Sequence, residues 1–107
     1  MKNIIWILIN CNNLKEADKI GKSLLKKRLI SCFDIFSRLK TSYFWPPKTG
    51  KIKSGKGAML ITETLSKNFS RVYKVTKLIH SDKLPFIGAI KVSVSDEYYD
   101  WVKSEIV

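Results

Sequence analysis

The chain has 107 residues, 45% of them hydrophobic, and a formal net charge of +11 at pH 7. This length and composition predict a single globular domain over residues 1–107 and exclude an intrinsically disordered chain. The longest apolar run, residues 4–9, is far shorter than the roughly 20 residues that span a bilayer. We therefore expect a cytoplasmic protein with no membrane span, in which Cys11 and Cys32 are reduced thiols.

The positive charge is concentrated in residues 1–91, which hold 19 basic and 5 acidic residues, whereas residues 92–107 hold 1 basic and 4 acidic residues. A basic surface attracts polyanions such as nucleic acid, anionic lipid or nucleotide phosphates. A lysine-rich surface that only contributes to solubility explains the same charge. Both interpretations stay open at this point.

The first predicted element is a central strand over residues 3–9, whose unbroken apolar run is typical of a strand buried on both faces. A helix over residues 14–30 follows, because apolar residues recur there at helical spacing. Asn13 and Glu16 have the spacing of a capping box and mark where this helix begins.

A long β-hairpin comes next, with strands at residues 31–45 and 51–63 on either side of a proline-containing turn. Odd-numbered residues from Phe33 to Trp45 alternate with polar ones, so we expect them to share one face. An arm of about fourteen residues reaches about 45 Å at ~3.3 Å per residue. A compact domain of this size is narrower than that, and we expect the arm to project into another subunit.

Gly55 and Gly57 mark a β-bulge in the second strand of the hairpin. Ser66 is the predicted cap of a second helix, whose apolar face runs from Phe69 to Ile79. A further strand is predicted over residues 84–94, followed by a short helix capped by residue 95 or 96.

The predicted order is β-α-β-β-α-β with a C-terminal helix, which is an α+β, ferredoxin-like sandwich with a long hairpin between its second and third strands. Two helices would cover one face of the sheet. The other face then needs either a partner or a polar surface.

Several short segments in a fixed order carry a resemblance to a known family. They are Leu29-Ile30-Ser31-Cys32-Phe33-Asp34, Tyr43-Phe44-Trp45 followed by Gly50-Lys51, His80 with Pro85 after it, and Tyr99-Asp100-Trp101. Together they resemble the CutA divalent-cation-tolerance family over essentially the whole chain. The resemblance implies a homotrimer built by hairpin arms, similarity to the PII signalling proteins, and a role in tolerance to copper and other divalent ions.

The chain departs from the family pattern at three places. Asp34 stands where the family usually has asparagine, and the hairpin turn is longer than the family's Trp-Glu-Gly-Lys turn. The segment from His80 to Phe86 lacks the proline, tyrosine and glutamate of the family motif. These changes leave the expected fold intact and affect only a site that uses the tyrosine or the glutamate.

Copper and zinc prefer thiolate and imidazole ligands, and Cys11, Cys32 and His80 are the soft ligands of this chain. Some members of the resembled family hold copper at the positions of Cys11 and His80, so these two are the predicted metal ligands. A Cys–His pair could hold Cu(I) or share a site with Asp82 or a neighbouring subunit. The alternative is that both thiols are buried apolar groups and His80 is a hydrogen-bonded helix end.

Four lysines lie along the hairpin near two aromatic residues: Lys48, Lys51, Lys53 and Lys56, with Tyr43 and Trp45. They could form a basic finger that binds an anionic ligand and stacks a base. Alternatively, the aromatic side chains pack inside a trimer and the lysines face water.

No catalytic constellation accompanies the single histidine, since no serine or cysteine is paired with it in the sequence. We therefore predict a non-enzymatic trimer with a role in divalent metal ion (copper) tolerance or binding. The alternative functions are a basic nucleic-acid or nucleotide-binding module and a structural trimer that scaffolds a partner protein.

Overall fold

The computed structural model describes residues 1–107 as one four-stranded antiparallel sheet with three α-helices. The elements are β1 (Lys2–Cys11), α1 (Leu14–Lys26), β2 (Cys32–Phe44), β3 (Ile52–Thr64), a 3₁₀ turn (Ser66–Asn68), α2 (Phe69–Ile79), β4 (Ile87–Val94) and α3 (Asp96–Glu105). The strand order is β2-β3-β1-β4. The predicted ferredoxin-like fold with a terminal helix is confirmed. The helices are all too short or too polar to cross a bilayer.

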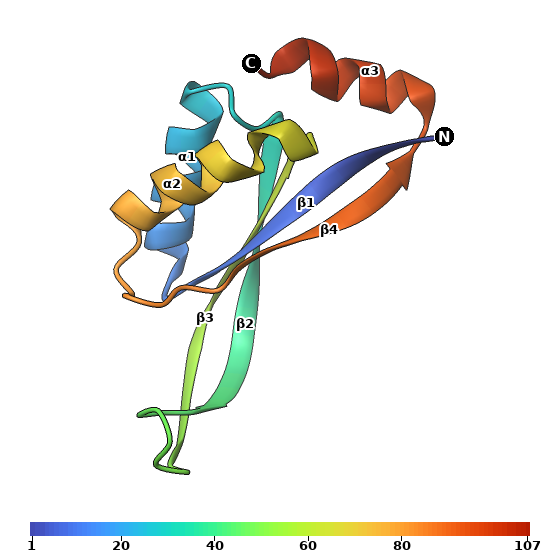
Figure 1. The fold of residues 1–107 in the computed structure, drawn as a ribbon. Helices are drawn as coiled ribbons and strands as arrows, with labels where there is room; N and C mark the ends of the chain where they lie inside the picture. The colour runs from blue at the N-terminus through green and yellow to red at the C-terminus, as the bar shows by residue number, and fades with distance from the viewer.

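Helices α1 and α2 cover one face of the sheet, and the core lies between them and the strands (Figure 1). Alternate residues of β1 point into this core and contact residues of α1, α2 and β3. The core residues of these four elements are Ile5, Ile7, Ile9, Cys11, Ala17, Ile20, Leu24, Ala58, Leu60 and Val72. Trp6 and Leu8 lie on the other face of β1 and are only half-buried. Ile4 lies on the same face as Trp6 and Leu8 but is only 1% exposed. The prediction that this strand is buried on both faces therefore holds at Ile4 and fails at Trp6 and Leu8 in a single chain.

Helix α1 begins as predicted, with the Asn13 side chain accepting a hydrogen bond from the Glu16 N–H at 2.8 Å. It ends at Lys26 rather than at residue 30. Arg28 has a φ of 56°, a left-handed conformation that no helix continues through. The chain thus turns toward β2 earlier than the apolar spacing indicated.

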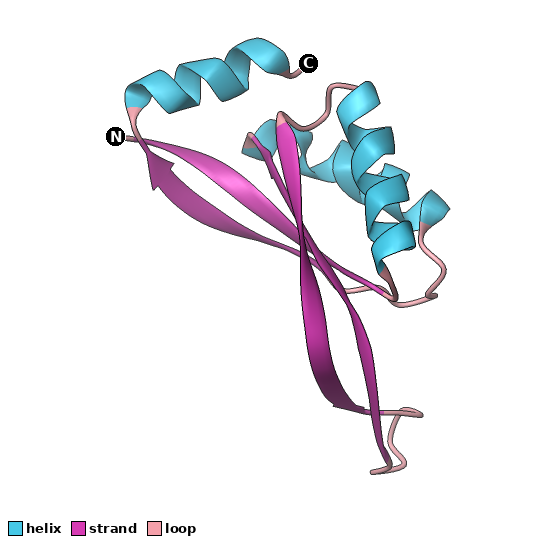
Figure 2. Ribbon diagram, turned by 180° about the vertical axis from the view of Figure 1, so that it is seen from behind, coloured by secondary structure: helices cyan, strands magenta, loops and turns pink.

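The arm, which consists of β2, β3 and the turn between them, projects away from the helices (Figure 2). The molecule accordingly measures 47 × 26 × 23 Å. Strand pairing is regular from Cys32↔Glu63 to Arg38↔Gly57 and shifts before Thr41↔Gly55. The predicted β-bulge is present, but its extra residue lies on β2, opposite the two glycines that indicated it.

This bulge overturns the prediction that the odd-numbered residues of β2 share one face. Directly paired residues of neighbouring strands lie on the same side of a sheet. Phe33 pairs with Thr62, and both side chains lie on the side of the helices, whereas Tyr43 pairs with Lys53. Thr62 and Lys53 are separated by an odd number of positions on β3. Because side chains alternate along β3, Phe33 and Tyr43 point to opposite faces.

Two further boundaries differ from the predicted ones. Ser66 does not cap α2 but opens a 3₁₀ turn, and α2 begins at Phe69 without a side-chain cap. Strand β4 begins at Ile87 rather than at residue 84. The cap of α3 is confirmed, since the Ser95 hydroxyl accepts a hydrogen bond from the Tyr98 N–H at 3.2 Å.

Gly57 lies where the arm passes close to the end of β1. A Cβ at this position would lie 2.6 Å from the Cys11 carbonyl oxygen, whereas a Cβ at Gly55 would meet nothing within 4 Å. We expect Gly57→Ala to lower the free energy of unfolding by about 1–3 kcal/mol. Gly55→Ala should be neutral or slightly stabilising, because it mainly restricts the unfolded chain. Urea denaturation of both variants measures the difference, and equal stabilities would contradict the close approach.

Candidate functional site

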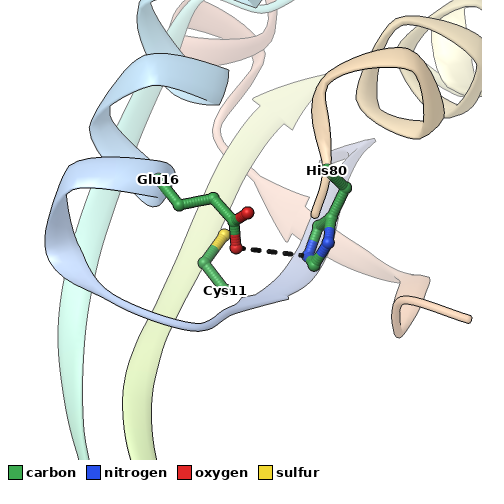
Figure 3. A group of neighbouring side chains, drawn as sticks. All are labelled: Cys11, Glu16 and His80. Carbon is green, nitrogen blue, oxygen red and sulfur yellow. Dashed lines mark ion pairs between the residues drawn. The ribbon is translucent and has the colours of Figure 1, made fainter. Parts of the chain in front are cut away.

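Cys11, Glu16 and His80, here called the donor triad, meet at the end of the sheet near the start of α1 (Figure 3). One possible ligand atom from each residue lies within 4.8 Å of the other two. Cys11 is the last residue of β1, Glu16 lies in the first turn of α1, and His80 follows the last residue of α2. The fold thus brings together three potential metal ligands from different elements.

Glu16 is held by hydrogen bonds from the two loops that flank it. Its Oε1 accepts a hydrogen bond from the Asn12 N–H at 2.9 Å, and its Oε2 accepts one from the Ser81 N–H at 3.0 Å. Burial opposes ionisation of this carboxyl, but the hydrogen bonds from Ser81 and Asn12 outweigh it and lower the pKa of Glu16. Glu16 is therefore a carboxylate at neutral pH.

Both ring nitrogens of His80 have hydrogen-bond partners. Nδ1 accepts a hydrogen bond from the Asp82 N–H at 3.0 Å, and Nε2 lies 2.6 Å from the carbonyl oxygen of Asn10. This network assigns the proton to Nε2, which donates it to Asn10. Nε2 also lies 3.8 Å from Glu16 Oε1. His80 is thus a hydrogen-bonded helix end, one of the two roles that its position in the sequence indicated.

The Cys11 thiol is buried and lies 3.8 Å from the carbonyl oxygen of Ile9. Burial, followed by the negative charge of Glu16, raises the pKa of Cys11 to about 12. The thiol is therefore protonated at neutral pH. A metal ion bound here would have to displace this proton. Binding through His80 Nε2 would also require the imidazole proton to move to Nδ1, which breaks the hydrogen bonds to Asn10 and Asp82.

The donor triad has the residue types of a zinc or copper site, since thiolate, imidazole and carboxylate are all ligands of these metals. Around a tetrahedral ion with bonds of ~2.0–2.3 Å, ligand atoms lie about 3.5 Å apart. The observed separations of up to 4.8 Å therefore require only a small contraction. Three protein ligands leave a fourth position open, which fits an accessory site rather than a closed structural one.

The predicted ligands Cys11 and His80 lie together. The sequence did not indicate Glu16 as a third ligand, because the capping box already explained a glutamate at this position. Only half of the capping box forms. Asn13 accepts a hydrogen bond from the Glu16 N–H, but the Glu16 carboxylate accepts hydrogen bonds from neighbouring loops instead. Asp82 lies outside the donor triad, where its Oδ1 accepts a hydrogen bond from the Asn12 amide at 2.9 Å.

Cys32 belongs to a separate hydrogen-bonded group around Glu63. The Cys32 thiol donates to Glu63 Oε1 at 3.2 Å, the Tyr98 hydroxyl donates to the same oxygen, and the Trp6 indole donates to Oε2 at 2.9 Å. Burial and then Glu63 raise the pKa of Cys32 to about 12. Cys32 therefore does not join Cys11 and His80.

The four lysines of the arm do not act as one finger. Lys53 and Lys56 line a cleft between the arm and the loop that follows α2, whereas Lys48 and Lys51 lie outside it, near the turn. Trp45 and Tyr43 also line this cleft. The arm thus separates its lysines into a pair beside aromatic side chains and a pair at its tip.

The fold and the donor triad together define a small ferredoxin-like protein with a projecting hairpin and a set of potential metal ligands. The family model of the CutA1 divalent ion tolerance protein matches residues 5–105, and the chain belongs to this family. The divalent-cation tolerance protein CutA of Archaeoglobus fulgidus is 33% identical over 102 residues, which cover 94% of this chain and 96% of that protein. Its counterpart from Thermotoga maritima is 31% identical over 96 residues, covering 89% and 91%.

Solved structures of similar proteins share the fold. The periplasmic divalent cation tolerance protein CutA from Archaeoglobus fulgidus has a TM-score of 0.90 at 32% identity, covering 97% of this chain and 99% of that one. CutA1 from Pyrococcus horikoshii has a TM-score of 0.88 at 27% identity, covering 96% and 98%. The resemblance drawn from the sequence is confirmed, and with it the relation to proteins named for divalent-cation tolerance.

Proposed function

We propose that this chain forms a non-enzymatic homotrimer that contributes to divalent metal tolerance by binding copper weakly at the donor triad. The observation that carries the proposal is the approach of three ligand atoms to within 4.8 Å of one another. Membership of the CutA1 divalent ion tolerance family supports the role in tolerance. Thiolate and imidazole favour copper and zinc over magnesium and calcium.

Copper would be cargo rather than a resident cofactor. Cys11 and His80 would supply the soft ligands, and Glu16 would supply a carboxylate whose charge is already present. Copper competes with the proton of the Cys11 thiol and with the hydrogen bonds of His80 to Asn10 and Asp82, which keeps the affinity low. A thiol ligand also requires a reducing compartment, and we propose the cytoplasm.

The homotrimer is supported by the apolar surface that a single chain leaves uncovered. Leu39, Phe44 and Ile52 on the arm are 83%, 71% and 67% exposed. Phe36 and Ile90 are exposed on the sheet face opposite α1 and α2. Large apolar patches on a soluble protein mark interaction sites, and neighbouring copies would bury this one. The number of subunits, three, comes from the resemblance to the CutA family.

Combining Cys11→Ser with His80→Ala should weaken copper binding by about tenfold or more, because two of the three proposed ligands are removed. Competition with a chromophoric Cu(I) chelator, under anaerobic and reducing conditions, measures the dissociation constant. Cys32→Ser is the matched control, since it removes the other free thiol and should leave the dissociation constant unchanged.

Both substituted side chains are buried, so circular dichroism should first establish that the double variant is folded. Glu16→Gln keeps the shape of the third ligand and should weaken binding less than the double substitution does. An unchanged dissociation constant in a folded double variant would place any bound copper elsewhere and refute the proposed site.

A further inference from the structure

The outer side of α1, which faces away from the sheet, carries a stripe of lysines (Figure 1). These lysines recur every three or four residues, so they lie along one side of the helix. They are Lys15, Lys19, Lys22 and Lys26, and all of them are exposed. The buried residues of α1 form the other side, against the sheet: Ala17, Ile20, Gly21 and Leu24.

Helix α2 extends this basic surface. The segment from Ser66 to Ile79 holds no acidic residue, and its basic residues are all exposed: Lys67, Arg71, Lys74 and Lys77. Lys74 is two positions from each of the buried residues Val72 and Thr76, so it points away from the sheet. We call the surface made by these basic residues of α1, α2 and the 3₁₀ turn the helical face.

The charge of the helical face is largely uncompensated. Helix α1 contains two carboxylates, of which Asp18 pairs with Lys22 at 2.9 Å. The other, Glu16, is turned toward Ser81 and His80. The remaining lysines of both helices take part in no ion pair of the chain. A surface with this excess of positive charge attracts an anionic partner.

The helical face stays accessible in the proposed trimer. Neighbouring copies would bury the apolar residues of the arm and of the sheet face opposite α1 and α2. The helical face lies on the other side of the sheet, and the arm projects away from it (Figure 2). The trimer therefore leaves these lysines free for another partner.

One apolar side chain among the lysines distinguishes between kinds of anionic partner. Leu78 is 88% exposed, more than any other large hydrophobic residue of the chain. It lies one helical turn after Lys74 and therefore on the same side of α2. A bilayer surface buries such a side chain at the boundary of its acyl chains, while its anionic headgroups attract the lysines. A nucleic acid binds lysines through its phosphates and offers Leu78 no apolar surroundings.

We propose that the helical face binds the surface of an anionic membrane, with its lysines at the lipid headgroups and Leu78 inserted between them. Clusters of about four to eight basic residues on amphipathic helices bind membranes that contain phosphatidylserine. The contact is peripheral, since the helices are too short or too polar to cross a bilayer. It does not depend on copper binding, because none of these lysines belongs to the donor triad.

Co-sedimentation of the full chain with lipid vesicles at physiological salt tests the proposal. The wild type should bind vesicles of phosphatidylcholine mixed with phosphatidylserine, and should not bind vesicles of phosphatidylcholine alone. Lys19→Gln combined with Lys74→Gln removes one charge from each helix. This double variant should lower the partition coefficient about tenfold or more, because each lysine near an anionic surface contributes about fivefold.

Lys48→Gln combined with Lys51→Gln is the matched control, because it removes the same charge from the turn of the arm. It should leave the partition coefficient nearly unchanged, since charges are screened beyond about 8 Å at this salt concentration. Leu78→Ser keeps the net charge and should lower the partition coefficient about fivefold or more. Sedimentation velocity without lipid checks that each variant assembles as the wild type does.

Four results would overturn the proposal. The wild type binds neither kind of vesicle or both equally, or the two lysine pairs weaken binding alike, as attraction by net charge alone predicts. Leu78→Ser binds as tightly as the wild type, in which case no side chain enters the bilayer. Finally, single-stranded RNA displaces the wild type from the vesicles and binds Leu78→Ser equally well, which would assign the helical face to nucleic acid.

Discussion

Phe44→Ser combined with Ile52→Ser is expected to convert the proposed trimer into monomers at micromolar protein concentration. The two residues pair directly across the outer end of the arm and are 71% and 67% exposed in a single chain. Burying an apolar side chain of this size contributes about 1.5–3 kcal/mol. Since every subunit supplies both residues, the assembly would lose this contribution six times over, which is about 9–18 kcal/mol.

Sedimentation velocity measures the change directly. Leu78→Ser is the control, because Leu78 is 88% exposed and belongs to α2 rather than to the arm, and its substitution should leave the assembly unchanged. The double variant should keep its circular dichroism spectrum, since neither substituted residue belongs to the core. A wild type that sediments as a folded monomer would refute the trimer, and a double variant that stays trimeric would refute the role of the arm tip.

Leu24→Ala is expected to have the largest effect on stability, lowering the free energy of unfolding by about 2–5 kcal/mol. Leu24 is fully buried in the core between α1 and the sheet, so its truncation leaves a cavity. Leu25 is the next residue of the same helix and is 40% exposed, and Leu25→Ala should cost less than about 1 kcal/mol.

Urea denaturation at one fixed protein concentration compares the two alanine variants, since the stability of an oligomer depends on concentration. The same chemical change at adjacent positions removes differences in composition and helix propensity from the comparison. If Leu25→Ala proved as destabilising as Leu24→Ala, the orientation of α1 on the sheet would be wrong, or Leu25 would be buried by a neighbouring subunit.

Local patterns were sufficient for most of the fold because they act over a few residues. The caps at Asn13 and Ser95 and the proline-containing turn of the hairpin were all readable in this way. The patterns misplaced the end of α1, which depends on one left-handed residue, Arg28. They also misassigned one face of β2, because a bulge opposite Gly55 and Gly57 reverses the alternation.

The sequence by itself determined the order of the elements, the family of the chain and two of the three potential metal ligands. These features depend on periodicity, turn residues and motif spacing, which are properties of the linear chain. Only the tertiary structure decided that Glu16 joins Cys11 and His80, and that the arm faces the loop after α2 across a basic and aromatic cleft. The physical reason is the strand order β2-β3-β1-β4. Pairing across the sheet places the end of β1 beside that loop, where the Asn10 N–H donates to the Phe86 carbonyl at 3.2 Å, and no pattern within one segment encodes such a contact.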